Sequence, residues 1–175
     1  MPLIKNARWI EDRYARIPDD APVPDARALI LSAGRLLAGA RDILARRGPT
    51  GVIWPNDRDI GELVPYLDRL ALIALVFPAF KDGRAYSQAR ALRERYGFRG
   101  ELRATGDVLR DQFLFLHRAG FDAFEVRKPE DAKAFWDALQ RYNVFYQPAA
   151  DGAASALRRR LFPASTQNLA VTEPA

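Results

Sequence analysis

The 175-residue sequence contains no cysteine and only one histidine, His117. Without thiols the chain has no disulfides and no cysteine nucleophile, and it cannot supply cysteine ligands to zinc, haem or an iron–sulfur cluster. A single histidine also argues against a transition-metal site built from protein ligands alone. Any redox or metal chemistry would therefore have to come from a bound cofactor or a partner.

Lysine is scarce as well: only four of the 27 basic residues are lysines, against 22 acidic residues and a net charge of +5. The planar arginine side chain binds two oxygens of a phosphate, sulfate or carboxylate at once. This composition is compatible with an anionic partner. The base composition of the genome could produce the same excess of arginine.

The sequence has no N-terminal pattern of basic, apolar and small residues typical of a secretory signal. Its longest apolar run, residues 70–80, is interrupted by Pro78 and is shorter than the roughly 18 residues that span a bilayer. We therefore expect a cytoplasmic protein with no membrane partner.

The length and the 49% hydrophobic content suit one globular domain. Pro18, Pro22 and Pro24 interrupt residues 1–26, which we interpret as an arm, and a helix is predicted from about Ser32 to the stop signal Gly48-Pro49. The fold would thus begin with an N-terminal helical arm. Residues 149–175, which contain the basic run 158–160, are predicted to be a disordered tail, and we do not expect it to bind nucleic acid.

From residue 51, short apolar runs alternate with amphipathic segments. The predicted strands are 52–54, 71–77, 101–105, 123–126 and 144–146, and the predicted helices are 60–70, 87–96, 107–119 and one that starts at 129. Such alternation implies right-handed crossovers and a mainly parallel sheet. We predict an α/β domain over residues 27–148 with about four to five βα units, either half-TIM-barrel-like or open and doubly wound.

Binding residues in such sheets gather at the carboxyl ends of the strands, which selects the loops 55–58, 78–87, 105–107 and 127–129. In the second loop Lys81 and Arg84 precede Ser87, a predicted helix cap, and Arg90 follows one turn later. Cations at a helix N-terminus suit a small oxyanion. The alternative is a turn, a cap and a solvated basic face.

Two predicted strands carry charges on one face. Glu101, Arg103 and Thr105 alternate with apolar residues, and Glu125 alternates with Phe124. Parallel strands buried on both faces are normally apolar throughout, so the pattern predicts a barrel interior, a pocket or a subunit interface. Arg103 and Glu125 could pair across neighbouring strands, in a structural or a catalytic role.

Asp107 is a candidate for the next loop, either as a binding residue or as a turn and cap residue. No catalytic residue and no metal ligand can be assigned, and the common nucleotide-binding and hydrolase motifs are absent. The candidate substrate-binding residues are Lys81, Arg84, Ser87, Arg90, Arg103, Thr105, Asp107 and Glu125.

Five segments between about residues 50 and 145 resemble the bacterial DUF934 family. They read FPAFKDGRAYSQAR (77–90), LRERYG (92–97), RGELRA (99–104), GDVLRDQ (106–112) and GFDAF (120–124). Ala85 stands where a glycine is common in the family. Members are uncharacterised and are usually described as oxidoreductases involved in sulfite reduction, because their genes lie beside those for sulfite reductase and adenylylsulfate-type reductase. The family has no established catalytic residues to transfer.

The resemblance implies an accessory or oxidoreductase component of assimilatory sulfate and sulfite reduction. Its partner would be sulfite reductase or the adenylylsulfate-type reductase, and its ligand a small oxyanion, a sulfonucleotide, or dissociable NADPH or flavin. The alternative is a non-catalytic partner or assembly protein of sulfite reductase. The polar inward face of a half-barrel also needs covering, so we expect either helix 28–47 to close the open edge or two chains to form a homodimer.

Overall fold

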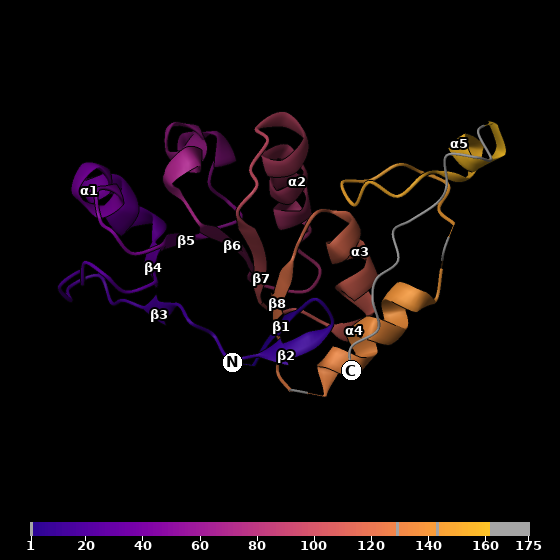
Figure 1. Cartoon of the computed structure of the whole chain (residues 1–175), viewed down its shortest axis with the longest axis horizontal. Coiled ribbons are helices and arrows are strands. Elements are labelled where there is room, and N and C mark those ends of the chain that lie inside the picture. Colours follow the sequence, from indigo (N-terminus) through magenta and orange to yellow (C-terminus); the bar gives the residue numbers. More distant parts are fainter. Residues whose placement is uncertain (1, 129, 143, 162–175) are drawn as a thin grey trace.

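A computed structural model describes residues 2–128, 130–142 and 144–161 of the chain (Figure 1). Its centre is one mixed eight-stranded sheet of order β2-β1-β8-β7-β6-β5-β4-β3. The pairs from β3 to β8 are parallel, whereas β1 pairs antiparallel with both β2 and β8. The strands are β1 (Leu3–Lys5), β2 (Arg8–Ile10), β3 (Ala15–Arg16), β4 (Leu29–Ser32), β5 (Thr50–Trp54), β6 (Leu72–Phe77), β7 (Glu101–Gly106) and β8 (Ala123–Glu125).

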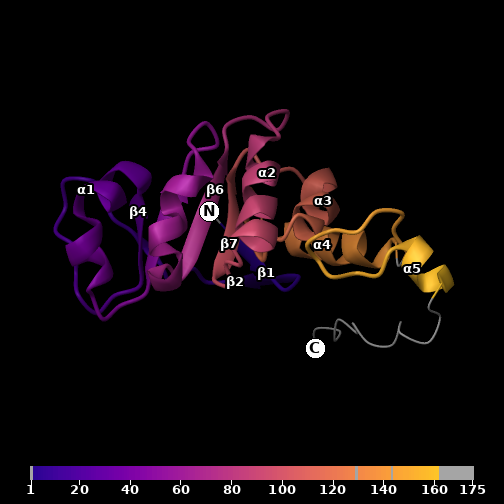
Figure 2. The same ribbon diagram turned by 90° about the horizontal axis from the view of Figure 1, so that it is seen from above.

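The helical connections between β4 and β8 lie on one face of the sheet, as Figures 1 and 2 show. Right-handed crossovers between strands that follow sequence order place every connection on the same side, whereas a doubly wound sheet reverses its order. The fold is therefore the half-barrel of the two predicted α/β architectures. The helices are α1 (Ala33–Leu44), η1 (Ile60–Arg69), α2 (Arg84–Arg90), η2 (Ala91–Arg95), η3 (Arg110–Gln112), α3 (Phe113–Arg118), α4 (Asp131–Gln140) and α5 (Ala156–Leu161).

The predicted N-terminal helical arm is wrong, because this segment forms strands at both edges of the sheet. Asn6 and Ala7 both have positive φ angles (53° and 58°), the conformation of a tight hairpin turn, and they join β1 to β2. This hairpin extends the sheet beyond β8, whereas β3 lies beside β4 at the opposite edge. Strands of two or three residues are too short for an alternation pattern to reveal them.

The helix predicted from about Ser32 is confirmed: α1 starts at Ala33, and the Ser32 hydroxyl accepts a hydrogen bond from the Arg35 N–H (3.1 Å). Residues 29–32 ahead of it form β4. Helix α1 packs on β4 and β5 in the same layer as the other helices. The expectation that it closes the open edge is therefore wrong, because β3 occupies that edge.

Two further predictions fail in local structure. Helix α2 begins at Arg84 with Gly83 as its N-cap, so Ser87 lies within the helix and is not its cap. Residues 144–146 form no strand, and Phe145 makes only an isolated bridge with Ser155. Gly97 (φ +66°) does end the preceding helical segment, as its position predicted.

The main core lies between the sheet and the helices. Its aromatic centre is Phe113 on α3, Phe124 on β8 and Phe135 on α4, whose ring centroids are 4.7–5.5 Å apart. The opposite, concave face has a small apolar cluster formed by Tyr14, Ile30, Leu72 and Ala74. Charged side chains gather on the part of this face formed by β7 and β8.

Residues 149–161 of the predicted tail are described and include α5, which lies away from the sheet (Figures 1 and 2). The segment is attached to α3 through Arg118, which pairs with Asp151 (3.1 Å) and lies 3.8 Å from the centroid of the Phe145 ring. Residues 162–175 lie outside the described residues. Within the described part of the chain, no helix has the length and apolar character needed to cross a membrane.

Candidate functional site

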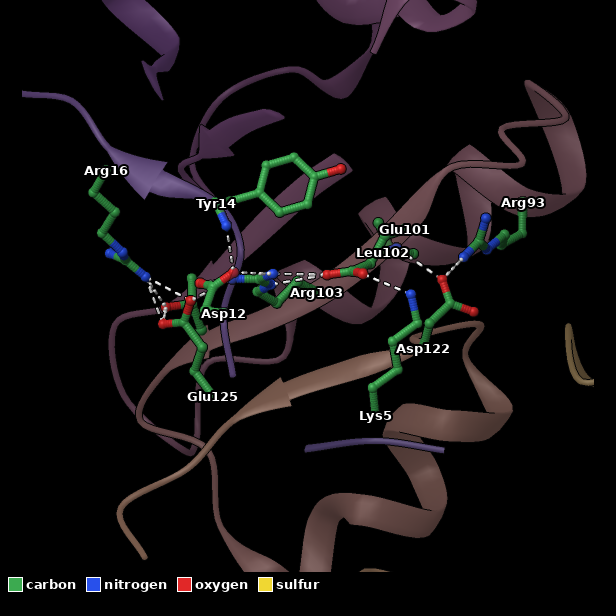
Figure 3. Close-up of polar contacts among 11 residues, drawn as sticks. Lys5, Asp12, Tyr14, Arg16, Arg93, Glu101, Leu102, Arg103, Asp122 and Glu125 are labelled. Carbon is green, nitrogen blue, oxygen red and sulfur yellow. Dashed lines mark hydrogen bonds and ion pairs between the residues drawn. The ribbon is translucent and has the colours of Figure 1, made fainter. Parts of the chain in front are cut away.

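The charged residues predicted on β7 and β8 meet on the concave face (Figure 3). The parallel register pairs Arg103 with Ala123, so alternate residues of the two strands project to the same side. The predicted contact between Arg103 and Glu125 is present at 3.3 Å. Thr105 also joins this cluster and donates a hydrogen bond to Glu125 Oε2 (2.6 Å).

The N-terminal segment supplies the other half of this cluster. Residues 11–14 connect β2 at one edge of the sheet to β3 at the other and cross the concave face (Figures 1 and 3). Both carboxylate oxygens of Asp12 accept hydrogen bonds from Arg103, at 2.6 and 3.1 Å. The ring of Tyr14 lies beside the guanidinium, 5.8 Å from centroid to Cζ. We call residues 11–14 the crossing segment.

Two more cations complete the cluster at its ends. Arg16 binds Glu125 (2.5 Å), and Lys5 binds Glu101 (2.7 Å). Glu101 also accepts hydrogen bonds from Arg103 Nη2 (2.8 Å) and Nε (3.1 Å). Three cations thus face three carboxylates. We call this set the concave-face network; its ionic members are Lys5, Asp12, Arg16, Glu101, Arg103 and Glu125.

Arg103 is the centre of the network, and only 1% of its surface is exposed. Burial opposes the charge of this guanidinium, but the bonds to Asp12 and Glu101 outweigh burial and raise its pKa. The first role of Arg103 is therefore to stabilise the fold, because removing any of its partners would leave a buried charge uncompensated.

Asp12 is the partner whose ionisation can be tested. Burial favours its neutral form, but the hydrogen bonds from Arg103 and from the Tyr14 N–H outweigh burial and lower its pKa. A carboxyl group with a depressed pKa stabilises the fold above its unfolded pKa of about 3.9, and this stability is lost as the pH falls through the folded pKa.

We therefore expect Asp12→Asn to be less stable than the wild type at neutral pH, and the difference to shrink below about pH 4. Urea unfolding at a series of pH values measures both curves. A difference that stays constant on acidification would contradict the role assigned to the carboxylate charge.

A second polar region lies at the carboxyl ends of the strands, where the loop after β5 meets α2. It borders an open depression with a volume of about 490 Å³, within the size range of small-molecule sites. We call it the carboxyl-end pocket; it is lined by Asn56, Asp57, Arg58, Asp59, Ile60, Arg84, Ser87 and Gln88.

Two guanidinium groups from different elements line the carboxyl-end pocket. Arg58 pairs with Glu62 and Arg84 with Asp82, each at 2.7 Å. The bond to Arg84 holds the pKa of Asp82 well below its usual value. All four side chains are at least one-fifth exposed. Solvent weakens exposed ion pairs of this kind, so a ligand anion can compete with either carboxylate.

Two of the polar residues that line this pocket, Asn56 and Gln88, are buried, and Gln88 has the better-defined contacts. Its amide nitrogen donates to the carbonyl oxygens of Pro55 (3.1 Å) and Arg58 (2.8 Å), which fixes the orientation of the amide. Its Oε1 atom is buried and has no hydrogen-bond partner among the described residues. A buried acceptor without a donor is rare in folded proteins, and either a water molecule or a ligand can supply the donor.

The remaining candidates do not gather at either site. Asp107 accepts hydrogen bonds from the Phe80 N–H (3.1 Å) and from Arg127 (2.7 Å), so it ties three loops together and caps no helix. Arg90 pairs with Glu94 on the exposed face of the helix, and Lys81 is exposed. The predicted site thus divides into Arg84 and Ser87 at the pocket and Arg103, Thr105 and Glu125 on the concave face.

Several participants were not among the sequence candidates. The loop containing Asn56 and Arg58 was selected by the carboxyl-end rule, but no local signal distinguishes Gln88 from an ordinary helix residue. Asp12 and Arg16 also have no signal, because they reach the network only through the path of the chain across the sheet.

The fold and these two regions define an α/β half-barrel whose concave face is neutralised by its own N-terminal segment and whose carboxyl-end loops form a polar pocket. The chain matches the family described as bacterial protein of unknown function (DUF934) over residues 51–157, more than half of its length, and it belongs to that family. No curated protein matches the chain. Within the described residues, no group of three or more potential metal ligands is placed to hold a metal ion.

Proposed function

We propose that the chain is a cytoplasmic accessory or oxidoreductase component of assimilatory sulfate and sulfite reduction. In this role it binds a small oxyanion, a sulfonucleotide, or a dissociable NADPH or flavin. The pathway comes from the family resemblance, and the carboxyl-end pocket supports the binding role.

The observation that carries the proposal is the combination of Arg58, Arg84 and the amide of Gln88 around one cavity. Two guanidinium groups suit an anionic oxygen cluster, and the Gln88 oxygen can accept a hydrogen bond from a hydroxyl or amino group. A sulfonucleotide carries both kinds of group, whereas sulfate carries only the first. The volume of about 490 Å³ accommodates either.

Titration calorimetry with sulfite, sulfate, adenylylsulfate, NADPH and FAD tests this proposal. We expect at least one of them to bind the wild type and Arg84→Ala to bind it at least about tenfold more weakly, because a charged hydrogen bond contributes about 1.5–3 kcal/mol. Arg90→Ala is the matched control: this arginine lies on the same helix outside the pocket lining, and its variant should bind like the wild type.

Absence of binding for all five ligands would overturn the binding role. Co-elution with purified sulfite reductase in that case would favour the alternative, a non-catalytic partner or assembly protein. The homodimer also stays a prediction, to be measured by light scattering, but covering the polar face does not require it, because the crossing segment already lies over this face.

A further inference from the structure

We propose that Arg103 on the concave face is a second anion site, which takes one small carboxylate or oxyanion, and that Asp12 is its built-in competitor. The site is independent of the carboxyl-end pocket. Its cavity is lined from β7 by Glu101 and Arg103, near the amino end of the strand.

The geometry of Asp12 on Arg103 is that of a bound carboxylate. Each oxygen accepts a hydrogen bond from a different Nη atom (2.6 and 3.1 Å), and Oδ1 also accepts one from the Tyr14 N–H (3.0 Å). This two-pronged contact is the mode in which arginine binds free carboxylates and oxyanions. An external anion of the same shape can make the same two bonds.

The charge of the surroundings also selects an anion. If Asp12 leaves, three cations (Lys5, Arg16 and Arg103) face two carboxylates, Glu101 and Glu125. The network then carries one excess positive charge, and Arg103, which is 1% exposed, loses two of its hydrogen bonds, which is unfavourable for a buried cation. A single negative charge restores neutrality, so the site favours a monoanion such as acetate or bisulfite.

The crossing segment can release Asp12 without unpairing the sheet. Residues 11–14 belong to no strand, and within the described residues their backbone makes one hydrogen bond, the local one from Tyr14 to Asp12. The neighbouring β1–β2 and β3–β4 pairings hold the segment at its two ends.

A cavity of about 250 Å³ already adjoins the guanidinium, so an anion has space beside Arg103. It is lined by Leu3, Lys5, Ile10, Glu11, Asp12, Arg13, Tyr14, Glu101 and Arg103.

The test follows the Nε–H resonance of Arg103 in solution by nuclear magnetic resonance during titration with sodium acetate and sodium sulfite. Sodium chloride at equal ionic strength is the reference for screening. Asp12→Ala should bind acetate and sulfite at least about tenfold more tightly than the wild type, because the competitor is gone. Asp19→Ala, which removes a carboxylate of the same N-terminal region outside this cavity, should behave like the wild type.

A second readout is hydrogen exchange at the Tyr14 amide, the backbone N–H of the crossing segment that Asp12 accepts from. Anion binding to the wild type should accelerate this exchange, because the anion displaces Asp12, whereas chloride should not. Asp12→Asn, which keeps the size of the side chain, is the variant to use if Asp12→Ala does not fold.

If the Arg103 signal of the folded variant responds to acetate and sulfite no more than to chloride, the proposal is wrong. Arg84→Ala separates the two sites, since it should impair only the carboxyl-end pocket.

Discussion

Replacing Arg103 with methionine lowers the free energy of unfolding by about 3–5 kcal/mol, the range expected when one member of a buried ion network is removed. The substitution leaves Asp12, Glu101 and Glu125 facing a side chain that cannot donate, with only Lys5 and Arg16 to balance them. Urea unfolding followed by circular dichroism measures the change.

Arg90→Met is the control for that experiment. Both side chains of the pair between Arg90 and Glu94 are about half exposed, and such substitutions usually change stability by less than about 0.5 kcal/mol. If Arg103→Met were as mild as this control, the concave-face network would not hold the crossing segment on the sheet.

Phe124→Ala has an effect of similar size on the opposite face of the sheet. Its ring is fully buried, with centroids 4.7 Å from Phe135 and 5.5 Å from Phe113, so it joins β8 to α3 and α4. Removing a buried phenylalanine ring typically lowers stability by about 3–5 kcal/mol through lost burial and a residual cavity.

Thermal and urea unfolding of Phe124→Ala should be compared with Phe115→Ala. Phe115 lies on α3 but is 65% exposed, so its removal should change stability by no more than about 0.5 kcal/mol. Equal effects of the two substitutions would mean that the aromatic cluster does not form the core contact described here.

The two large effects reflect the two ways in which this half-barrel buries its faces. Helices cover the convex face with apolar contacts, as in a complete barrel. In a complete barrel the inward side chains are covered by the other strands, whereas here Tyr14 and Asp12 of a single crossing segment cover them. This is why one charged residue has as much influence as a core phenylalanine.

Part of this arrangement was predictable from local sequence. The alternation of Glu101, Arg103 and Thr105 placed charges on one face of a strand. It also allowed Arg103 and Glu125 to pair across neighbouring strands, and the structure contains that contact. The anion-binding roles of Arg84 and Ser87 stay predictions. Ser87 lines the carboxyl-end pocket, but it lies inside the helix and does not cap it.

The contribution of the N-terminal segment was not predictable in this way. Asp12 and Arg103 are 91 residues apart in the chain, and nothing in the composition around residue 12 indicates where its carboxylate goes. The role of Gln88 was not predictable either. It depends on hydrogen bonds to carbonyl oxygens of a loop that is 30 and 33 residues away in the chain.

By itself the sequence determined the α/β class, the half-barrel as one of two architectures, the charged face of β7 and the absence of thiol chemistry. These features depend on residue type and on the spacing of residues within one helix or strand, and the periodic pattern of apolar and charged residues shows that spacing directly. Only the tertiary structure decided that strands within residues 3–16 complete the sheet at both edges, and that the carboxylate of Asp12 binds the buried guanidinium of Arg103. Those outcomes depend on which distant segments meet, and that is set by the packing of the whole sheet.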